Sequence, residues 1–226
     1  MLKESLKQKA YRLIKAKIIS CEYAPGTGLT EAFLLEDTSL SRTPIRDALG
    51  RLEQEGLVSI ISKKGMRVSD VTINDIKMVW ETRNLVEPYI IRQHGEKLDK
   101  AALLWIKEQF ALLLAAEAAL TEHSSGELEM RYALDDKLHR HIVRSSGNTY
   151  LETLMNQINN QNIRLRIMTS ITHRRLIESH NEHTKIIDHL LAGQYEHAAF
   201  SMEEHLLKFR EASFSAIIKN GGWVMP

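Results

Sequence analysis

The 226-residue sequence predicts a mainly α-helical protein with one short stretch of β-structure. In the first 71 residues, three segments with apolar residues at helical spacing precede two short β-type runs around a glycine-containing turn. From residue 72 onward the apolar spacing is helical throughout. The first pattern is typical of a winged helix-turn-helix domain, and the second of an all-α antiparallel helical bundle. We therefore expect two domains, residues 1–71 and 72–226.

The first domain is expected to contain three helices and a hairpin. A helix over residues 3–19 is ended by "YAPGTG", because proline and glycine interrupt helices. A short helix over residues 31–36 follows, and a third helix begins at Ser41, a residue type that favours the N-cap. The runs "LVSII" and "MRVSDV" are expected to pair as strands around the turn "SKKG".

The second domain is expected to be a bundle of six helices. Thr72 and Asp75 resemble a capping box, which indicates that a new helix begins there. Apolar residues then recur at helical spacing over residues 73–94, 98–122, 127–146, 149–168, 173–192 and 195–219. Because the breaks between these segments are short, neighbouring helices are expected to be antiparallel.

The composition is that of an ordinary globular protein, with 43% apolar residues, 26% charged residues and a net charge of +1. Residues 1–70 are mildly basic, with 12 Lys+Arg against 9 Asp+Glu. Cys21 is the only cysteine, and no signal peptide or membrane-spanning run is present, so we expect a cytoplasmic protein with no membrane partner. No glycine-rich phosphate loop, CxxC pair or Ser-His-Asp order indicates other chemistry.

The start of the third helix carries residues suited to reading DNA. Arg42, Thr43 and Arg46 would project from its first turns, and helices that enter the major groove contact bases with their N-terminal residues. Arginine can bind guanine through two hydrogen bonds, and hydroxyl groups can bind bases or phosphate. Lys63 and Lys64 at the hairpin tip would reach the neighbouring backbone or minor groove. The alternative is a capped surface helix whose arginines are only solvated.

Three stretches, "APGTGLTE", "SRTPIRDALGRLEQEGLV" and "KKGMRVSDVT", resemble the N-terminal domain of GntR-family transcriptional regulators in order and spacing. The resemblance covers residues 5–71 and implies a regulator that binds a palindromic, double-stranded operator as a homodimer. By position, it implies DNA contacts from Arg42, Thr43, Arg46 and Gly65, with Ser41 alongside. Two features depart from the family: "EDTSL" lacks the turn glycine that many relatives carry, and Ala32 stands where some relatives have an arginine.

Several of the ten histidines fall in a pattern that suits a metal ion. Asp135 and His139 are four residues apart and share one helix face, while His183 and His205 belong to apolar helical patterns that point inward. One carboxylate and three imidazoles would suit a divalent ion such as zinc, nickel or manganese. Spacing alone does not place these helices face to face. We expect His141, His180 and His189 to be structural or surface residues.

The stretches "LDDKLHRHIVRSSGNTYL", "NEHTKIIDHLLAGQYEHAAFSMEEHL" and "VWETRNLVEP" resemble the FCD effector domain of the FadR-like GntR branch. Many FCD domains bind a metal through an aspartate and three histidines, and the matching positions are Asp135, His139, His183 and His205. The doubled carboxylate leaves Asp136 as a possible substitute for Asp135, and Leu138 replaces a common aromatic residue. The alternative is a polar core without a metal.

FCD regulators generally respond to small organic acids or related metabolites, so the resemblance implies an effector pocket. Arg83 matches an arginine that many FCD domains point into the cavity, where it could bind a carboxylate through two hydrogen bonds. An exposed salt bridge to Glu87 is the alternative for Arg83. Weaker pocket candidates are Asn148 and either Arg164 or Arg166, although we expect the run "RLRIM" to turn its charged residues outward.

These features together predict a metabolite-responsive transcription factor, with repression as the expected mode and no enzymatic activity. One alternative is a DNA-binding dimer whose bundle only dimerises and binds no effector. Another is a metal-dependent hydrolase, in which the ion activates water. The hydrolase hypothesis does not explain the presence of the N-terminal domain.

Overall fold

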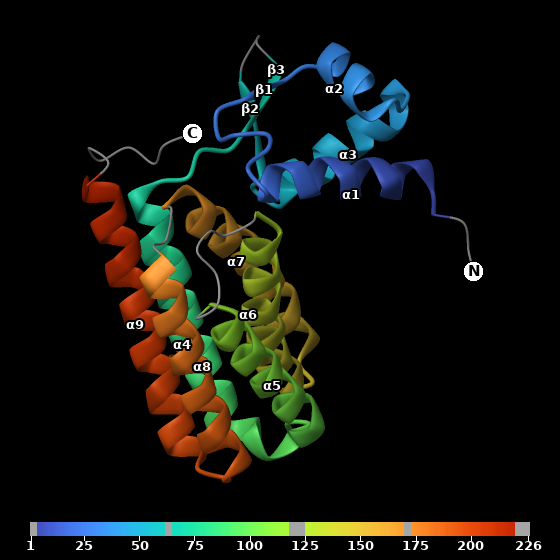
Figure 1. Cartoon of the computed structure of the whole chain (residues 1–226). Coiled ribbons are helices and arrows are strands. Elements are labelled where there is room, and N and C mark those ends of the chain that lie inside the picture. Colours follow the sequence, from blue (N-terminus) through green and yellow to red (C-terminus); the bar gives the residue numbers. More distant parts are fainter. Residues whose placement is uncertain (1–3, 62–64, 118–124, 170–172, 220–226) are drawn as a thin grey trace. The chain divides into compact units, whose positions relative to one another are not determined.

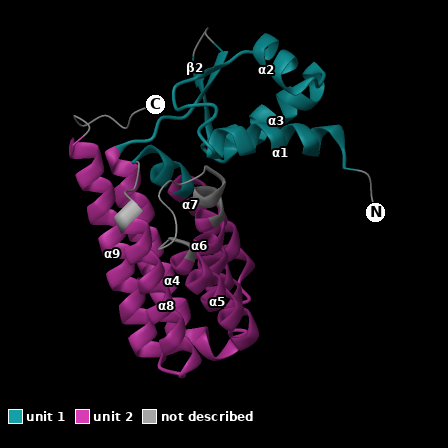
Figure 2. Cartoon of the chain, viewed as in Figure 1, with its two compact units in different colours: residues 1–72, 163–169, 223–226 teal, residues 73–162, 170–222 magenta. Residues whose placement is uncertain are grey.

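The mainly α-helical architecture expected from the sequence is confirmed, with one small β-sheet (Figure 1). The computed structural model describes residues 4–61, 65–117, 125–169 and 173–219. Its chain forms two compact units (Figure 2). Unit 1 consists mainly of residues 1–72 with residues 163–169, and unit 2 consists of residues 73–162 and 170–222.

Unit 1 is built on three helices around an apolar core. These are α1 (Leu6–Ile19), α2 (Glu31–Thr38) and α3 (Arg42–Gln54). The side chains of Ser5 and Thr30 accept hydrogen bonds from backbone N–H groups in the first turns of α1 and α2, which explains where these helices begin. The fully buried residues at the centre of the core include Ile14, Ile18, Leu34, Ile45 and Leu52.

A three-stranded antiparallel sheet completes unit 1. β2 (Val58–Ile61) and β3 (Gly65–Val68) form the expected hairpin, in which Val58 lies opposite Val68. β1 (Gly28–Leu29) pairs with the other edge of β3, so the strand order is β1-β3-β2. The sequence does not predict β1, because two residues are too few for an alternating pattern and the neighbouring glycines indicate a break.

Two turns of unit 1 require left-handed backbone. Gly56, with φ of 71°, follows α3, and the N–H of Leu57 donates to the carbonyl of Leu52 at 2.9 Å, a common way to end a helix. Ser39, with φ of 54°, occupies the turn before α3. The turn that lacks glycine in the sequence thus keeps the backbone conformation that glycine favours.

The six long helices that the sequence predicts form unit 2 (Figure 1), apart from residues 163–168, which belong to unit 1. They are α4 (Ile73–His94), α5 (Lys100–Glu117), α6 (Ser125–Ser145), α7 (Thr149–Met168), α8 (His173–Leu191) and α9 (Tyr195–Lys219). A short 3-10 helix at Gly95–Lys97 follows α4, so α5 starts two residues later than expected. The last residues of the predicted helix over 98–122 lie outside the described residues. No helix in the described ranges is long and apolar enough to cross a membrane.

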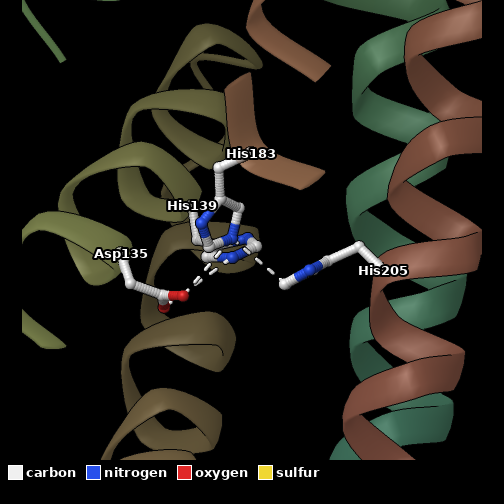
Figure 3. Close-up of side chains that lie close together, drawn as sticks. All are labelled: Asp135, His139, His183 and His205. Atoms are coloured by element: carbon white, nitrogen blue, oxygen red, sulfur yellow. Dashed lines mark hydrogen bonds and ion pairs between the residues drawn. The ribbon is translucent and has the colours of Figure 1, made fainter. Parts of the chain in front are cut away.

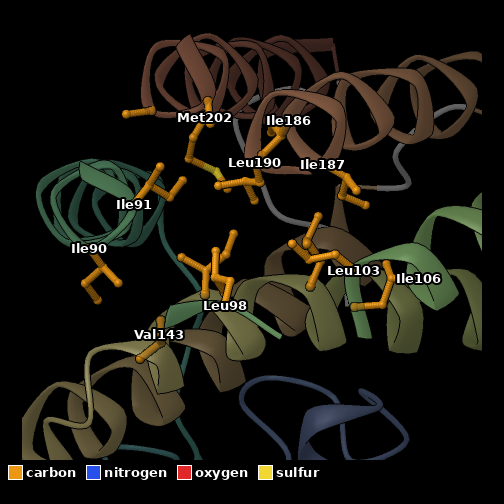
Figure 4. Packing of buried hydrophobic residues seen from close by; sticks show 14 of the residues in the cluster. Ile90, Ile91, Leu98, Leu103, Ile106, Val143, Ile186, Ile187, Leu190 and Met202 are labelled. Carbon is orange, nitrogen blue, oxygen red and sulfur yellow. The ribbon is translucent and has the colours of Figure 1, made fainter. Parts of the chain in front are cut away.

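Aliphatic side chains from several helices fill the core of unit 2 (Figure 4). α4 packs along α9, and α9 packs along α8. Ile91, Leu103, Ile187 and Met202 illustrate the packing, and burying each such side chain contributes about 1.5–3 kcal/mol. Gly95 sits against Tyr195 so closely that a β-carbon there would overlap the ring.

Candidate functional site

Asp135, His139, His183 and His205 meet inside unit 2 (Figure 3). Asp135 and His139 come from α6, where their spacing of four puts both on one face, while His183 comes from α8 and His205 from α9. All four residues are buried, and one ligand atom from each lies within 4.8 Å of the others. The structure thus places together the four residues singled out in the sequence.

The Nε2 atoms of the three histidines face a shared space. Nε2 of His183 lies 3.3 Å from Oδ1 of Asp135 and 3.2 Å from Nε2 of His205. Nε2 of His139 lies 3.8 Å from Oδ2 of Asp135, is buried, and has no hydrogen-bond partner among the described residues. One carboxylate and three imidazoles that converge in this way form a donor set suited to a divalent transition metal.

Asp136, the other carboxylate considered in the sequence, points elsewhere. It accepts hydrogen bonds from Nε of Arg140 at 2.5 Å and from the side-chain amide of Asn159. It also lines a cavity beside the cluster. Asp135 is therefore the aspartate whose oxygen reaches the histidines.

Two glutamates lie behind the histidines. Oε2 of Glu87, on α4, is 2.5 Å from Nδ1 of His139, and Oε2 of Glu182, on α8, is 2.8 Å from Nδ1 of His205. Neither role is predicted by the sequence. Glu87 is noticeable only as a neighbour of Arg83, and Glu182 only because it precedes His183, so neither has a spacing signal that points to a histidine.

Burial and charge keep His183 and His205 neutral and Glu87 and Glu182 ionised near pH 7. Burial lowers the pKa of His205 to about 4 despite its hydrogen bond to Glu182, and burial with the nearby His205 lowers the pKa of His183 well below its usual range. Burial alone would raise the pKa of Glu87, but attraction from Arg83 and His139 outweighs it and lowers that pKa to about 2. Neutral imidazole is the form that binds metals.

A small cavity lies next to the cluster. Its solvent space of about 20 Å³ is enough for one or two water molecules. The ionisable groups on its wall include three arginines and three carboxylates: Arg83, Arg140, Arg144, Glu87, Asp136 and Glu152. Because these charges are equal in number, the wall itself provides no net positive charge for an anion.

Arg83 is the cavity arginine best placed to bind a ligand. Its Nε donates to Oε1 of Glu87 at 2.6 Å, so the expected pairing with Glu87 exists. Both side chains are buried, however, and the alternative of an exposed salt bridge is wrong. The two terminal nitrogens of Arg83 are buried and have no partner among the described residues. They are available for a carboxylate.

The weaker pocket candidates lie elsewhere. Asn148 is exposed, does not line the cavity, and accepts hydrogen bonds from the backbone N–H groups of Tyr150 and Leu151, which caps α7. Arg164 and Arg166 are buried rather than turned outward, so that expectation is wrong. Arg164 donates to the carbonyl oxygen of Ser69 within unit 1, a backbone partner that helical spacing does not reveal.

The remaining candidate histidines stay outside the cluster, as expected. His141 is half-buried on α6, and burial lowers its pKa. His180 is buried beside Phe110, with ring centroids 5.0 Å apart. His189 contacts the side chain of Gln194 at 2.8 Å.

The first turns of α3 present an exposed polar face. Ser41, Arg42, Thr43 and Arg46 are exposed, whereas the neighbouring Pro44 and Ile45 are buried. Ser41 is at the N-cap position as expected, but its side chain makes no capping hydrogen bond. This leaves the hydroxyl available to other partners.

Glu31, at the start of α2, holds the two arginines of this face. Its Oε1 accepts from Nε of Arg46 at 2.5 Å, and its Oε2 lies 4.0 Å from Nε of Arg42. Both guanidinium groups remain more than two-thirds exposed. Gly65 is exposed at the start of β3, while Lys63 and Lys64 lie outside the described residues.

Comparisons with known proteins match both units. The family model for bacterial regulatory proteins of the gntR family matches residues 6–68, and the model for the FCD domain matches residues 78–208. The HTH-type transcriptional repressor GlaR of Escherichia coli is 25% identical over 205 residues, which cover 87% of this chain and 90% of GlaR.

Solved structures share the fold. A GntR transcriptional regulator from Rhodococcus sp. RHA1 has a TM-score of 0.76 at 18% identity and covers 92% of this chain and 97% of its own. The Zn²⁺-bound FCD domain of the regulator TM0439 has a TM-score of 0.52 at 20% identity and covers 67% of this chain and 99% of its own.

Proposed function

Because the chain belongs to the gntR family of bacterial regulatory proteins and carries an FCD domain, we propose that it is a metal-containing repressor that responds to a small organic acid. It is a DNA-binding transcriptional regulator and not an enzyme. The observation that carries the proposal is the convergence of one aspartate and three histidines beside a cavity with an unsatisfied arginine.

Asp135, His139, His183 and His205 would hold the ion. The donor set fits zinc, nickel or manganese, and the zinc bound by the related FCD domain favours zinc. A bound divalent ion would supply positive charge, and an ion that accepts a fifth ligand would keep a coordination position open beside the four protein ligands. The burial of one carboxylate and three imidazoles at a single point supports the proposal, because a bound ion would offset part of the cost of burying these polar groups.

The cavity would hold the acid. Its wall has balanced charge, whereas a divalent ion next to the single carboxylate of Asp135 leaves one positive charge in excess. The terminal nitrogens of Arg83 can donate two parallel hydrogen bonds to a carboxylate. The balance therefore favours a small monoanionic acid that binds only when the ion is present.

DNA binding would use the exposed face of α3. Arg42, Thr43 and Arg46, which are exposed, would reach base edges, and Ser41 and Gly65 would contact phosphate. Lys63 and Lys64 would reach the neighbouring backbone or minor groove. A homodimer would present two such faces to a palindromic operator. The name of the relative GlaR supports repression as the mode of control.

Elemental analysis of the full-length, untagged protein tests the metal centre. We expect about one divalent ion per chain, and loss of that ion from both Asp135→Ala and His205→Ala variants, because each removes one of four ligands. Asp136→Asn is the matched control and should retain the ion. A wild-type protein that holds no ion even after incubation with zinc, nickel and manganese would refute the metal centre.

Calorimetric titration with a panel of small monocarboxylic, hydroxy and keto acids tests the effector. Binding is expected in the ion-loaded protein, and it should be lost in the chelator-treated protein and in the Arg83→Gln variant. If DNA affinity is unchanged across the whole panel, the chain is a DNA-binding dimer without a small-molecule effector. The small cavity keeps that second candidate open.

A further inference from the structure

The three histidines of the cluster differ in what lies behind them. Nδ1 of His139 contacts Glu87 at 2.5 Å, and Nδ1 of His205 contacts Glu182 at 2.8 Å. Nδ1 of His183 is buried and has no hydrogen-bond partner among the described residues. Its ring instead stacks on Phe110, with centroids 5.1 Å apart.

The two glutamates are themselves held in place by cations. Arg83 donates to Oε1 of Glu87 at 2.6 Å. Arg175 donates to both oxygens of Glu182 at 3.1 and 2.8 Å, and Nζ of Lys208 lies 3.2 Å from Oε1. An ionised carboxylate can only accept hydrogen bonds, so each of these imidazoles must carry a proton on the Nδ1 that faces the glutamate. In the neutral form that binds metals, the Nε2 lone pairs of His139 and His205 are then directed toward the cluster.

The position of His183 then requires the opposite tautomer. Its Nε2 lies 3.2 Å from Nε2 of His205, which has no proton to donate, and 3.3 Å from the oxygen of Asp135, which is an acceptor. A hydrogen bond to either group needs a proton on Nε2 of His183. A metal ion needs that same nitrogen as a lone-pair donor.

We propose that Glu87 and Glu182 are positioning residues that hold His139 and His205 ready to bind an ion, whereas His183 must change tautomer when the ion binds. The proton on Nε2 of His183 leaves to solvent, and one from solvent adds to Nδ1, so the ring remains neutral and no net proton is released. The second half of this inference rests on the proposed metal centre; the first half concerns the ion-free protein.

Long-range ¹H–¹⁵N correlation spectra of the full-length protein with labelled histidine test the tautomers directly. In chelator-treated protein, His139 and His205 are expected as Nδ1–H tautomers and His183 as the Nε2–H tautomer. Addition of zinc should convert His183 to Nδ1–H and leave the other two unchanged. Detection of His183 as Nδ1–H before zinc is added, or of His139 or His205 as Nε2–H, would overturn the inference.

Variants of the two glutamates test positioning. Glu87→Ala and Glu182→Ala should each weaken zinc binding roughly 10–100-fold. In each variant, the Nε2–H tautomer should appear at the histidine that faced the removed glutamate and at no other histidine. Glu87→Gln and Glu182→Gln retain an oxygen that can accept a hydrogen bond from Nδ1. These variants should therefore keep most of the zinc affinity and the Nδ1–H tautomer of the facing histidine. Asp136→Asn removes a nearby charge without touching a histidine and should change neither.

The outcomes separate this inference from the metal centre itself. Alanine variants with wild-type zinc affinity and unchanged tautomers would reject the positioning roles while the metal centre stands. A wild-type protein that binds no ion would reject the metal centre, and the tautomers of the ion-free protein would still decide the first half. Glu182 is partly exposed, so its variants remain informative if loss of the buried Glu87 prevents folding.

Discussion

At the residue scale, Ser39 has a backbone conformation that does not suit its side chain. With φ of 54° it lies in the left-handed region, which costs most residues about 1–2 kcal/mol. Ser39→Gly should therefore raise the free energy of unfolding by about 0.5–1 kcal/mol, after allowance for the greater freedom of glycine in the unfolded chain. Urea unfolding measures the change.

The matched control for Ser39 is Gly56, which has a similar backbone conformation with φ of 71°. Gly56→Ala places a β-carbon where none is favoured, and the free energy of unfolding should fall by about 1 kcal/mol. Opposite signs for the two variants support the backbone argument. If both variants are destabilising, the turn before α3 depends on the serine side chain rather than on its backbone.

Arg46 is the residue on the exposed face of α3 with the most direct test. Arg46→Ala should weaken operator binding by about 1–3 kcal/mol, because a base contact through two hydrogen bonds contributes that much to recognition. Fluorescence anisotropy with a selected operator measures the loss. Arg12→Ala removes an equally exposed arginine from α1 and should have a much smaller effect. Equal losses for both variants would indicate only general charge attraction.

Residue types and spacing predict which residues of unit 2 could bind a metal, but they do not predict which residues surround that site. Asp135 and His139 can be placed on one face from their spacing, and His183 and His205 stand out by apolar patterns that point inward. The resemblance to FCD domains then supported the set of four. The pairing of Glu87 with His139 and of Glu182 with His205 joins different helices, so no local pattern predicts it. Arg164 illustrates the same limit, because its partner is a distant backbone carbonyl.

At the element scale, α4 has one face that the described residues of unit 2 leave exposed. Met78, Leu85 and Tyr89 follow one another at intervals of seven and four residues, which places them on one side of the helix, and all three are exposed. Exposed apolar stripes of this kind often mark protein interfaces. We expect this face of α4 to form the interface of the proposed homodimer.

Leu85→Glu should convert a dimer into monomers, because it places a charge in the apolar interface. Light scattering coupled to size-exclusion chromatography measures the mass. The matched control is Leu104→Glu, since Leu104 is also exposed but lies on α5. A Leu85→Glu protein that stays dimeric would move the interface to another surface.

Helix boundaries were predictable because unit 2 repeats its apolar residues at helical spacing. α4, α7 and α9 have the predicted bounds, and α5, α6 and α8 differ from theirs by few residues where they are described. β1 was not predictable, since it exists only because β3 offers a free edge to two residues near Gly28. Elements with an internal pattern can be read from the sequence, whereas elements defined by their partners cannot.

At the scale of the whole molecule, each unit has its own apolar core. The unit 1 core contains residues such as Ile14 and Leu52, and the unit 2 core contains residues such as Phe110 and Ile186. The cluster of Asp135 and three histidines lies entirely in unit 2. An ion bound there is therefore expected to stabilise unit 2 and to leave the stability of unit 1 unchanged.

Differential scanning calorimetry of the full-length protein tests this expectation. We expect two unfolding transitions, of which only one moves when zinc is added. At a free zinc concentration about one hundred times the dissociation constant, stabilisation is about 2.7 kcal/mol, equivalent to a rise of about 5–10 °C in the midpoint for a unit of this size. In the Asp135→Ala variant, neither transition should move. A single transition that moves as a whole would mean that the two units unfold together, and an unmoved pair in the wild type would mean that no ion binds. A single transition that moves with zinc would still support the metal centre, because an ion bound anywhere in a chain that unfolds cooperatively stabilises the whole chain.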